Sequence, residues 1–352
     1  MRQISAASAA QDVMLFKPQT AWRVRWNTNT DTPLPPDEPT APNPPEGAII
    51  DYYLKTAASG PVTVEILDGT TVLRKYSSDD EVFRPSPATS TIPLYWYREP
   101  MTLKTTAGMH RFTWDVHYQP VDGVNRVGGP GLPIAAIGYN TVPVPGTPWA
   151  NPGTYTVRLT VNGKSYTQPI LVKQDPRVKT SAIHMQQVYS QSRAAYDGAV
   201  AARTTAAKAR AMRDQIAAVQ PKASGAVAEA LTAFDKKVEA IIGAAAAGGG
   251  RGRGAGGGGG GGGGRGAGPA AGGPAVETLA SAGAALSGVM NLLQAADVQP
   301  TAMQLAAIAS ARAQASRVMA RWNAISGVEL PALNAKLKAA ELPSVGVAGT
   351  GR

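Results

Sequence analysis

The sequence contains no cysteine, and only 16% of its 352 residues carry a charged side chain. Without cysteine the chain can form neither disulfides, nor a thiolate nucleophile, nor a cysteine-based metal site. No stretch of about 18 apolar residues occurs, so no membrane-spanning helix is predicted. Residues 1–5 lead into a polar Ala/Ser run without the apolar core of a secretory signal. Either the chain stays inside the cell, or it is one piece of a longer exported protein.

Glycine and proline are abundant, with 39 and 28 residues respectively, which indicates much irregular chain. The length is sufficient for two ordinary domains, because single cores rarely grow beyond about 250 residues. The formal net charge of +10 comes from lysines and arginines that are scattered along the chain. We interpret this charge as a generally basic surface and expect no nucleic-acid partner.

The middle of the chain carries the clearest strand signals. In 108–118 the alternation predicts a strand with one face formed by His110, Phe112, Trp114 and Val116 and the other by Met109, Arg111, Thr113 and Asp115. A second alternating run follows at 154–161, and Asp68-Gly69 predicts a hairpin turn. Strands with one apolar face need a second sheet to cover them, so residues 46–175 predict a β-sandwich whose last strand lies at 168–172.

Two segments precede the predicted sandwich. Within 1–26, Trp22, Val24 and Trp26 alternate with arginines, which predicts a strand that has no earlier strand to pair with. Within 27–45, proline recurs so often that an extended linker is predicted. We therefore interpret 1–26 as the remnant of a preceding domain and 27–45 as a proline-rich linker.

The hydrophobic periodicity changes from two to about 3.6 residues after Asp175-Pro176. Helices with one apolar stripe each are predicted within 181–219, 224–241, 276–293 and 301–322, with a short further helix at 330–337. Each stripe must be buried against the others, so residues 176–345 predict an antiparallel helical bundle. Residues 247–273 interrupt it and are almost entirely glycine, alanine and arginine, a composition that predicts a disordered tether.

The order of motifs at 43–54, 108–115, 152–157 and 175–178 resembles the C-terminal region of large bacterial exported proteins. Those proteins carry a sortilin-like, BNR-repeat β-propeller and are commonly labelled glycosyl hydrolases. The resemblance extends from about Leu15 to the end of the last helix. The middle motifs are also similar to the Ig-like fold of flagellar hook-capping proteins. The resemblance implies an α+β multidomain chain in which an Ig-like, fibronectin-III-like sandwich precedes the helical bundle.

The resemblance implies a non-catalytic accessory or interaction module that packs on or presents a β-propeller. The implied partners are that propeller, carbohydrate or other exported proteins, and the implied location is extracellular or periplasmic. A first alternative is part of a sialidase-like or BNR-like glycosyl hydrolase whose catalytic residues lie in the propeller, which these residues do not contain. A second alternative is a carbohydrate- or protein-binding surface module.

The candidate binding residues are aromatic. Tyr95, Trp96 and Tyr97 lie in one long loop and Trp149 lies in another. Together they would form a platform for a sugar or a peptide. The alternative is that these rings cap one end of the sandwich, since large aromatic side chains bury much apolar area.

No pattern predicts a catalytic, cofactor-binding or metal-binding residue. The histidines, His110, His117 and His184, are too few and too separated for a three-histidine site, and His110 is expected to be packed and hydrogen-bonded. Asp115 and His117 share a predicted strand face, which indicates an ion pair. The acidic run 79–81 lacks the ligand spacing of a calcium loop and predicts a solvated turn. Glycoside hydrolysis needs two carboxyl groups at a fixed separation, and no such pair is recognisable.

Overall fold

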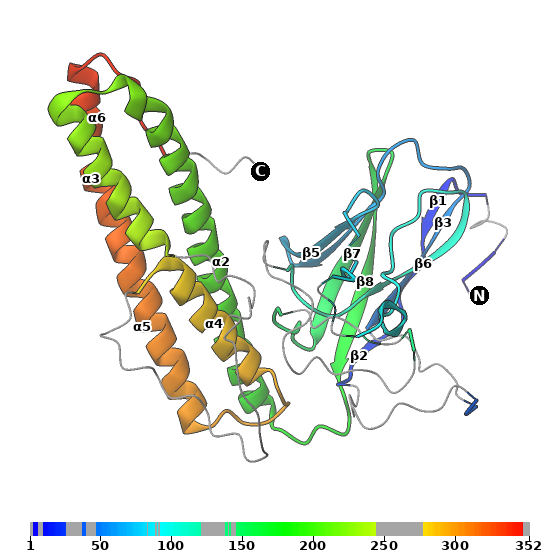
Figure 1. Cartoon of the computed structure of the whole chain (residues 1–352). Helices are drawn as coiled ribbons and strands as arrows, with labels where there is room; N and C mark the ends of the chain where they lie inside the picture. The colour runs from blue at the N-terminus through cyan, green and yellow to red at the C-terminus, as the bar shows by residue number, and fades with distance from the viewer. Residues whose placement is uncertain are drawn as a thin grey trace. The chain divides into compact units, whose positions relative to one another are not determined.

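A computed structural model describes residues 3–5, 10–25, 37–39, 47–82, 84–88, 90, 92–120, 138–139, 141, 146–243 and 277–347. These residues form a mixed α+β structure with two β-sheets and a group of helices (Figure 1). The chain divides into two compact units, Met1–Ser190 with Gln294–Gln299, and Gln191–Leu293 with Pro300–Arg352. The predicted linker 27–45, except 37–39, and the predicted tether 247–273 lie outside the described residues.

Both sheets belong to the first unit. One has the strand order β1-β3-β6, with β1 at Val13–Leu15, β3 at Ala48–Leu54 and β6 at Gly108–Trp114. The other has the order β2-β8-β7-β4-β5. Its strands are β2 (Ala21–Arg23), β4 (Thr63–Asp68), β5 (Thr71–Ser77), β7 (Gly153–Val161) and β8 (Lys164–Gln174). Neighbouring strands are antiparallel, except that β2 runs parallel to β8.

The first strands lie in the same sheets as the later ones, whereas the sequence assigns residues 1–26 to a preceding domain. In β1, Val13 pairs with Leu54 of β3. In β2, Ala21 pairs with Val172 of β8. The strand that lacks an earlier partner therefore has a later one. Alternation shows that a strand forms, but it does not show which distant strand lies beside it.

Aromatic side chains connect the two sheets. Trp114 of β6 meets Tyr155 of β7 edge to face, with ring centroids 5.6 Å apart. Phe112 meets Tyr76 of β5 in the same way at 4.7 Å. Phe112 and Trp114 are buried and Arg111, which precedes Phe112, is exposed, which confirms the predicted faces of this strand.

The alternation of β6 ends earlier than predicted. Val116 has φ of 59°, a left-handed conformation that is rare for a β-branched residue. Its side chain is nevertheless buried, and its carbonyl accepts a 2.7 Å hydrogen bond from the N–H of Ala150. The chain therefore turns after Trp114, and the residues that follow no longer keep the strand register.

Glycine-containing turns set the hairpins. The predicted turn at Asp68-Gly69 is present, with Gly69 at φ of 58°. A second turn, Asn162-Gly163, joins β7 to β8, and both of its residues have positive φ, as a type I′ turn requires. This turn starts β8 at Lys164, so the last strand is longer than the predicted 168–172.

The helices lie where the apolar stripes predict them. They are α2 (Ala182–Val219), α3 (Gly225–Ile242), α4 (Leu279–Leu293), α5 (Ala302–Ala324) and α6 (Leu330–Ala339). In the second unit their stripes meet in one core, to which each helix contributes a residue buried to 1% exposure or less: Met212, Leu231, Leu279, Val318 and Leu337. Among the described helices, none is both long and apolar enough to cross a bilayer.

The last two helices are continuous rather than separate. A π-helical turn, Ile325–Glu329, joins α5 to α6, and the N–H of Leu330 donates to the carbonyl of Ile325. Pro331 follows this turn. Proline has no N–H and its ring conflicts with the carbonyl four residues earlier, and a wider turn relieves that conflict without ending the helix.

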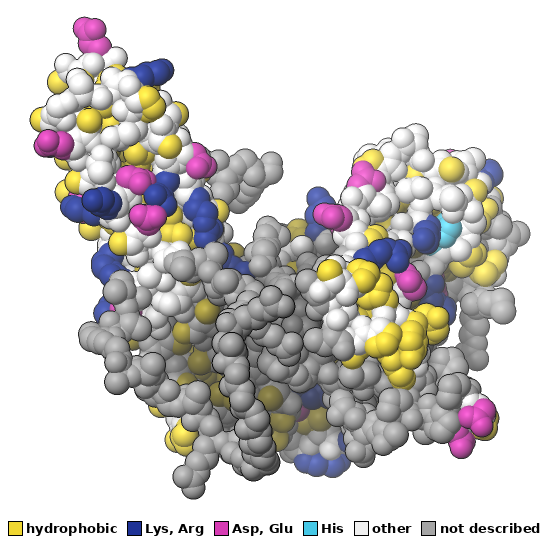
Figure 2. Space-filling model, viewed as in Figure 1, with side chains coloured by type: hydrophobic (Ala, Val, Ile, Leu, Met, Phe, Trp, Pro, Cys, Tyr) yellow, Lys and Arg dark blue, Asp and Glu magenta, His cyan; other side chains and the backbone are white. Residues whose placement is uncertain are grey.

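Charges are mixed on the surface. On the face in Figure 2, lysine and arginine side chains are interspersed with aspartate and glutamate. Ion pairs occur within the second unit, for example between Arg213 and Asp235 at 2.7 Å. This distribution agrees with the scattered basic residues of the sequence.

Candidate functional site

The predicted aromatic residues Tyr95 and Trp96 lie in η1, a 3₁₀ turn at Leu94–Trp96. The ring of Tyr95 contacts the rings of Trp96 and Tyr139, at centroid distances of 5.4 Å and 6.3 Å. Backbone hydrogen bonds hold the two segments together. The N–H of Tyr139 donates to the carbonyl of Tyr95 at 2.8 Å, and the N–H of Thr141 donates to that of Trp96 at 2.9 Å.

We call Tyr95, Trp96 and Tyr139 the aromatic surface. Tyr95 is 51% exposed and Tyr139 is 66% exposed, so their rings face solvent. Tyr97 is different, because its side chain is buried and its hydroxyl lies 3.2 Å from that of Ser90. One of the three predicted loop aromatics is therefore part of the packing. Tyr139 was missed because no periodic pattern surrounds it in its Gly- and Pro-rich insertion.

Trp149, the fourth predicted aromatic residue, belongs to another cluster. Its ring lies 4.0 Å from that of His117. The guanidinium carbons of Arg23 and Arg25 lie 5.5 Å and 5.4 Å from its ring centroid, close enough for cation–π attraction. The backbone N–H of Trp149 donates to Gln294 at 2.7 Å. Within the described part of the chain, its ring therefore contacts one histidine and two arginines rather than the aromatic surface.

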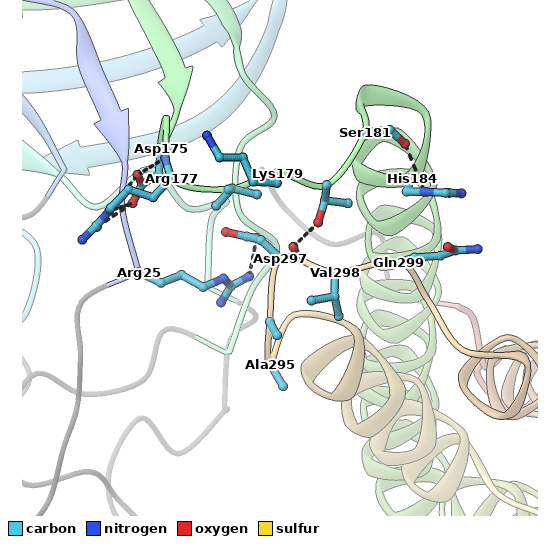
Figure 3. A pocket seen from close by; sticks show the side chains of 13 residues that line it. Arg25, Asp175, Arg177, Lys179, Ser181, His184, Ala295, Asp297, Val298 and Gln299 are labelled. Carbon is cyan, nitrogen blue, oxygen red and sulfur yellow. Dashed lines mark hydrogen bonds and ion pairs between the residues drawn. The ribbon is translucent and has the colours of Figure 1, made fainter.

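A charged network lies next to Trp149, and the sequence does not predict it. Arg25 donates to one carboxylate oxygen of Asp297 at 3.0 Å (Figure 3). Arg23 donates to the same oxygen at 2.5 Å. Gln174 donates to the other oxygen at 3.2 Å, and the hydroxyl of Thr180 donates to the Asp297 carbonyl at 2.6 Å. We call Arg23, Arg25, Gln174 and Asp297 the Asp297 network.

Burial makes these charges depend on one another. The side chains of Arg23 and Asp297 are each 4% exposed. Burial raises the pKa of Asp297, but the hydrogen bond from Arg25 and the charges of both arginines outweigh it, so that this pKa lies below its ordinary value. Burial lowers the pKa of Arg23, and Asp297 opposes that effect. The carboxylate is therefore ionised and is the counter-charge of a buried guanidinium.

Sequence separation explains why the network was missed. Asp297 lies 274 residues after Arg23, as a single acidic residue in the connection between α4 and α5. The alternation at 22–26 places Arg23 and Arg25 on one face of the chain, but it does not show that Arg23 is buried while Trp22 is exposed. Two arginines that alternate with apolar residues were the only available signal.

The predicted ion pair between Asp115 and His117 is wrong. Nδ1 of His117 lies 2.7 Å from the backbone carbonyl of Asp115. The Asp115 carboxylate instead accepts hydrogen bonds from the backbone N–H of His117 at 3.1 Å and from the hydroxyl of Tyr76 at 3.3 Å. Burial lowers the pKa of His117 more than the charge of Asp115 raises it. The imidazole is therefore neutral, and the turn at Val116 explains the lost strand geometry.

The lowered pKa of His117 predicts a pH effect on stability. Unfolded histidine takes up a proton near pH 6.5, whereas folded His117 does so only at lower pH. The stabilising effect is therefore complete above about pH 6.5, and it is lost as the pH falls from there, by up to about 1.4 kcal/mol per pH unit. We expect His117→Asn to flatten this slope in denaturant unfolding followed by tryptophan fluorescence.

His110→Gln is the matched control, because His110 is only half-buried. This control should keep the wild-type slope. An unchanged slope in His117→Asn would show that another group titrates.

The position of His110 agrees with its prediction as a packed histidine, since it lies against the ring of Tyr52 at 5.1 Å and contacts the carbonyl of Thr106 at 2.6 Å.

The remaining candidates have local contacts. The carboxylate of Asp80 accepts from the N–H of Ser77 at 2.7 Å, so the acidic run is part of an exposed turn after β5. His184 contacts the hydroxyl of Ser181 at 3.0 Å. Within the described part of the chain, no group of three histidine, aspartate or glutamate residues could hold a metal ion.

The geometry thus offers exposed rings at one place and guanidinium groups at another. Exposed tyrosine and tryptophan provide apolar contact area with a polar edge, and arginine provides donors for anionic acceptors. Both arrangements suit non-covalent recognition.

Comparisons with protein-family models, curated proteins and solved structures found no match for this chain.

Proposed function

We propose that this chain is a non-catalytic interaction module whose aromatic surface contacts a protein partner. The supporting observation is that Tyr95 and Tyr139 remain exposed although backbone hydrogen bonds fix the segments that carry them. Tyrosine and tryptophan dominate the binding energy of many interfaces, because they bury a large area at a small entropic cost. An exposed pair of tyrosines beside Trp96 therefore matches the anchor of an interface.

The proposal includes a finer architecture. We propose that the two sheets form an Ig-like, fibronectin-III-like sandwich and that the helices form an antiparallel bundle. Ring contacts between the sheets, such as Trp114 with Tyr155, and the shared apolar core of the helices support this architecture. Loops of such sandwiches commonly carry binding residues on a rigid scaffold, and η1 lies in such a loop.

The proposed partner is a β-propeller of the sortilin-like, BNR-repeat type. Its support is the resemblance of the motifs at 43–54, 108–115, 152–157 and 175–178 to regions that accompany such propellers. The proposed location is accordingly extracellular or periplasmic. Under the hydrolase alternative, this chain would act only together with catalytic residues of a propeller.

The decisive experiment measures binding of the full chain to a purified sortilin-like β-propeller by biolayer interferometry. We expect the double variant Tyr95→Ala/Tyr139→Ala to weaken binding at least about tenfold, since an anchor residue usually contributes more than about 1 kcal/mol. Thermal unfolding should be unchanged, because both side chains are exposed. Trp22→Ala is the matched control, since Trp22 is an aromatic residue of β2 that is 45% exposed.

Each other outcome contradicts part of the proposal. Equal weakening by the control would show that the aromatic surface is not the contact, and absence of binding would exclude this partner. Binding to a carbohydrate panel that requires Tyr95 and Tyr139 would identify the surface as a sugar site instead. Hydrolysis of aryl glycosides by the chain alone would favour the hydrolase alternative.

A further inference from the structure

The turn between β7 and β8 contains Asn162, which is the only asparagine followed by glycine in the sequence. Asn162 and Gly163 are both exposed, and both have positive φ. Val161 pairs with Lys164 across the turn, so the hydrogen bond that closes it does not use the N–H of Gly163. A side-chain carbon added at Gly163 would meet nothing beyond its chain neighbours within 4 Å. The backbone nitrogen of Gly163 is therefore open to reaction.

Ser59 holds the side chain of Asn162. The backbone N–H and the hydroxyl of Ser59 both donate to Oδ1 of Asn162, each at 2.9 Å. Ser59 lies in the connection between β3 and β4, so the two hydrogen bonds tie that connection to the tip of the β7–β8 hairpin. The carboxamide of Asn162 is thus exposed to solvent but fixed in orientation.

We propose that Asn162 is a site of spontaneous deamidation and that Ser59 controls its rate. The backbone nitrogen of Gly163 attacks Cγ of Asn162 and forms a five-membered succinimide. The carboxamide nitrogen leaves as ammonia and takes the amide proton of Gly163 with it. Water then opens the ring at either of its two carbonyl carbons, which gives aspartate or isoaspartate at this position. The reaction consumes only water and needs no redox partner.

The other described asparagines lack this combination. Asn151 precedes Pro152, whose nitrogen carries no proton to release. Asn291, Asn323 and Asn334 lie in α4, α5 and α6, where the next N–H is engaged in the helix and a larger residue follows. Asn162 is therefore the described asparagine at which the attacking nitrogen is least obstructed.

The folded turn slows the reaction, and Ser59 is part of the reason. Asn162 has φ of 49°, the left-handed conformation of a type I′ turn. Closure of the succinimide ring requires the backbone to rotate out of this conformation, so the turn must first open locally. The hydrogen bonds from Ser59 oppose that opening. Loss of one of them should accelerate deamidation by about two- to tenfold, the ratio that corresponds to one ordinary hydrogen bond.

The two products differ in their effect on the hairpin. Aspartate keeps an oxygen that accepts from Ser59, so the turn can persist. Isoaspartate adds a methylene group to the backbone of a two-residue turn, which no longer fits the pairing of Val161 with Lys164. Modification to isoaspartate should therefore release the β3–β4 connection from the hairpin tip.

The test incubates the full chain in mildly alkaline buffer and follows each asparagine over time by peptide mapping with mass spectrometry. We expect deamidation at Asn162 to exceed that at Asn323 and Asn334, which are the internal controls. Ser59→Ala should accelerate it by about two- to tenfold. Ser165→Ala is the matched control, because it removes an exposed hydroxyl of the same hairpin that contacts Thr160 instead of Asn162.

A second measurement follows wild-type deamidation in denaturing urea, where Asn162 should react faster than in the folded chain. Deamidation at Asn162 no faster than at Asn323 would overturn the proposed site. Equal rates in Ser59→Ala and Ser165→Ala, or a slower rate in Ser59→Ala, would overturn the role of Ser59. Equal rates with and without urea would contradict protection by the turn.

Discussion

Replacement of Trp114 by alanine should lower the free energy of unfolding of the first unit by about 3 to 5 kcal/mol, as for other large core truncations. The side chain of Trp114 is completely buried. Its ring packs edge to face on Tyr155 of the opposite sheet, and its indole N–H donates to the carbonyl of His117 at 2.9 Å. Alanine would leave a cavity between the sheets and an unpaired buried carbonyl. Denaturant unfolding of both proteins measures the difference.

Arg111→Ala is the matched control on the same strand. Arg111 is exposed and pairs with Asp51 at 2.8 Å on the surface. Exposed ion pairs contribute about 1 kcal/mol or less, so this change should have a small effect. Trp114→Phe separates the two contributions, because phenylalanine fills most of the space and cannot donate to His117. Equal destabilisation by Trp114→Ala and Arg111→Ala would contradict the register of β6.

The position of Trp114 could be predicted because it depends on local chemistry. Alternation of apolar and polar residues determines which face of a strand is buried, whatever strand lies beside it. The same holds for the helical stripes, whose residues meet in the core of the second unit. A local backbone conformation can also end such a pattern. The left-handed backbone of Val116 has no signal in the sequence, and the strand ends at Trp114 rather than at residue 118.

Features that depend on distant segments could not be predicted. The strand at 21–23 was recognised, but its parallel pairing with β8 was not. Asp297 has no distinctive neighbours in the sequence, and only the folded chain places it against Arg23. The same dependence on distant segments limited the prediction of the aromatic binding residues. Composition identified Tyr95, Trp96, Tyr97 and Trp149, but the fold buries Tyr97, separates Trp149 and adds Tyr139.

Replacement of Asp297 by alanine should destabilise the first unit by about 3 to 5 kcal/mol, the usual effect of removing one partner of a buried ion pair. The cause is the guanidinium of Arg23, which is 4% exposed and would lose its only ion-pair partner among the described residues. Arg25 is less affected, since 27% of its side chain already reaches solvent. Denaturant unfolding gives the total effect. Amide hydrogen exchange in β2 and in residues 294–299 shows where the loss is concentrated.

Low pH should reproduce this loss of stability in the wild-type protein. The pKa of Asp297 is lower in the folded chain than its ordinary value of 3.8. The folded state therefore gains stability from this carboxylate above about pH 3.8, and the gain disappears as the pH falls through the folded pKa. Asp297→Ala should lack this part of the acid dependence.

Two variants distinguish a buried charge from simple loss of packing. Asp51→Ala removes the partner of an exposed arginine and should cost about 1 kcal/mol or less. Arg23→Met/Asp297→Ala removes both buried charges while methionine keeps much of the apolar volume, so it should recover most of the stability lost in Asp297→Ala. If the double variant is as unstable as the sum of its single changes, the unpaired charge is not the cause. Recovery would establish that Asp297 is needed chiefly to neutralise Arg23 within the sheet.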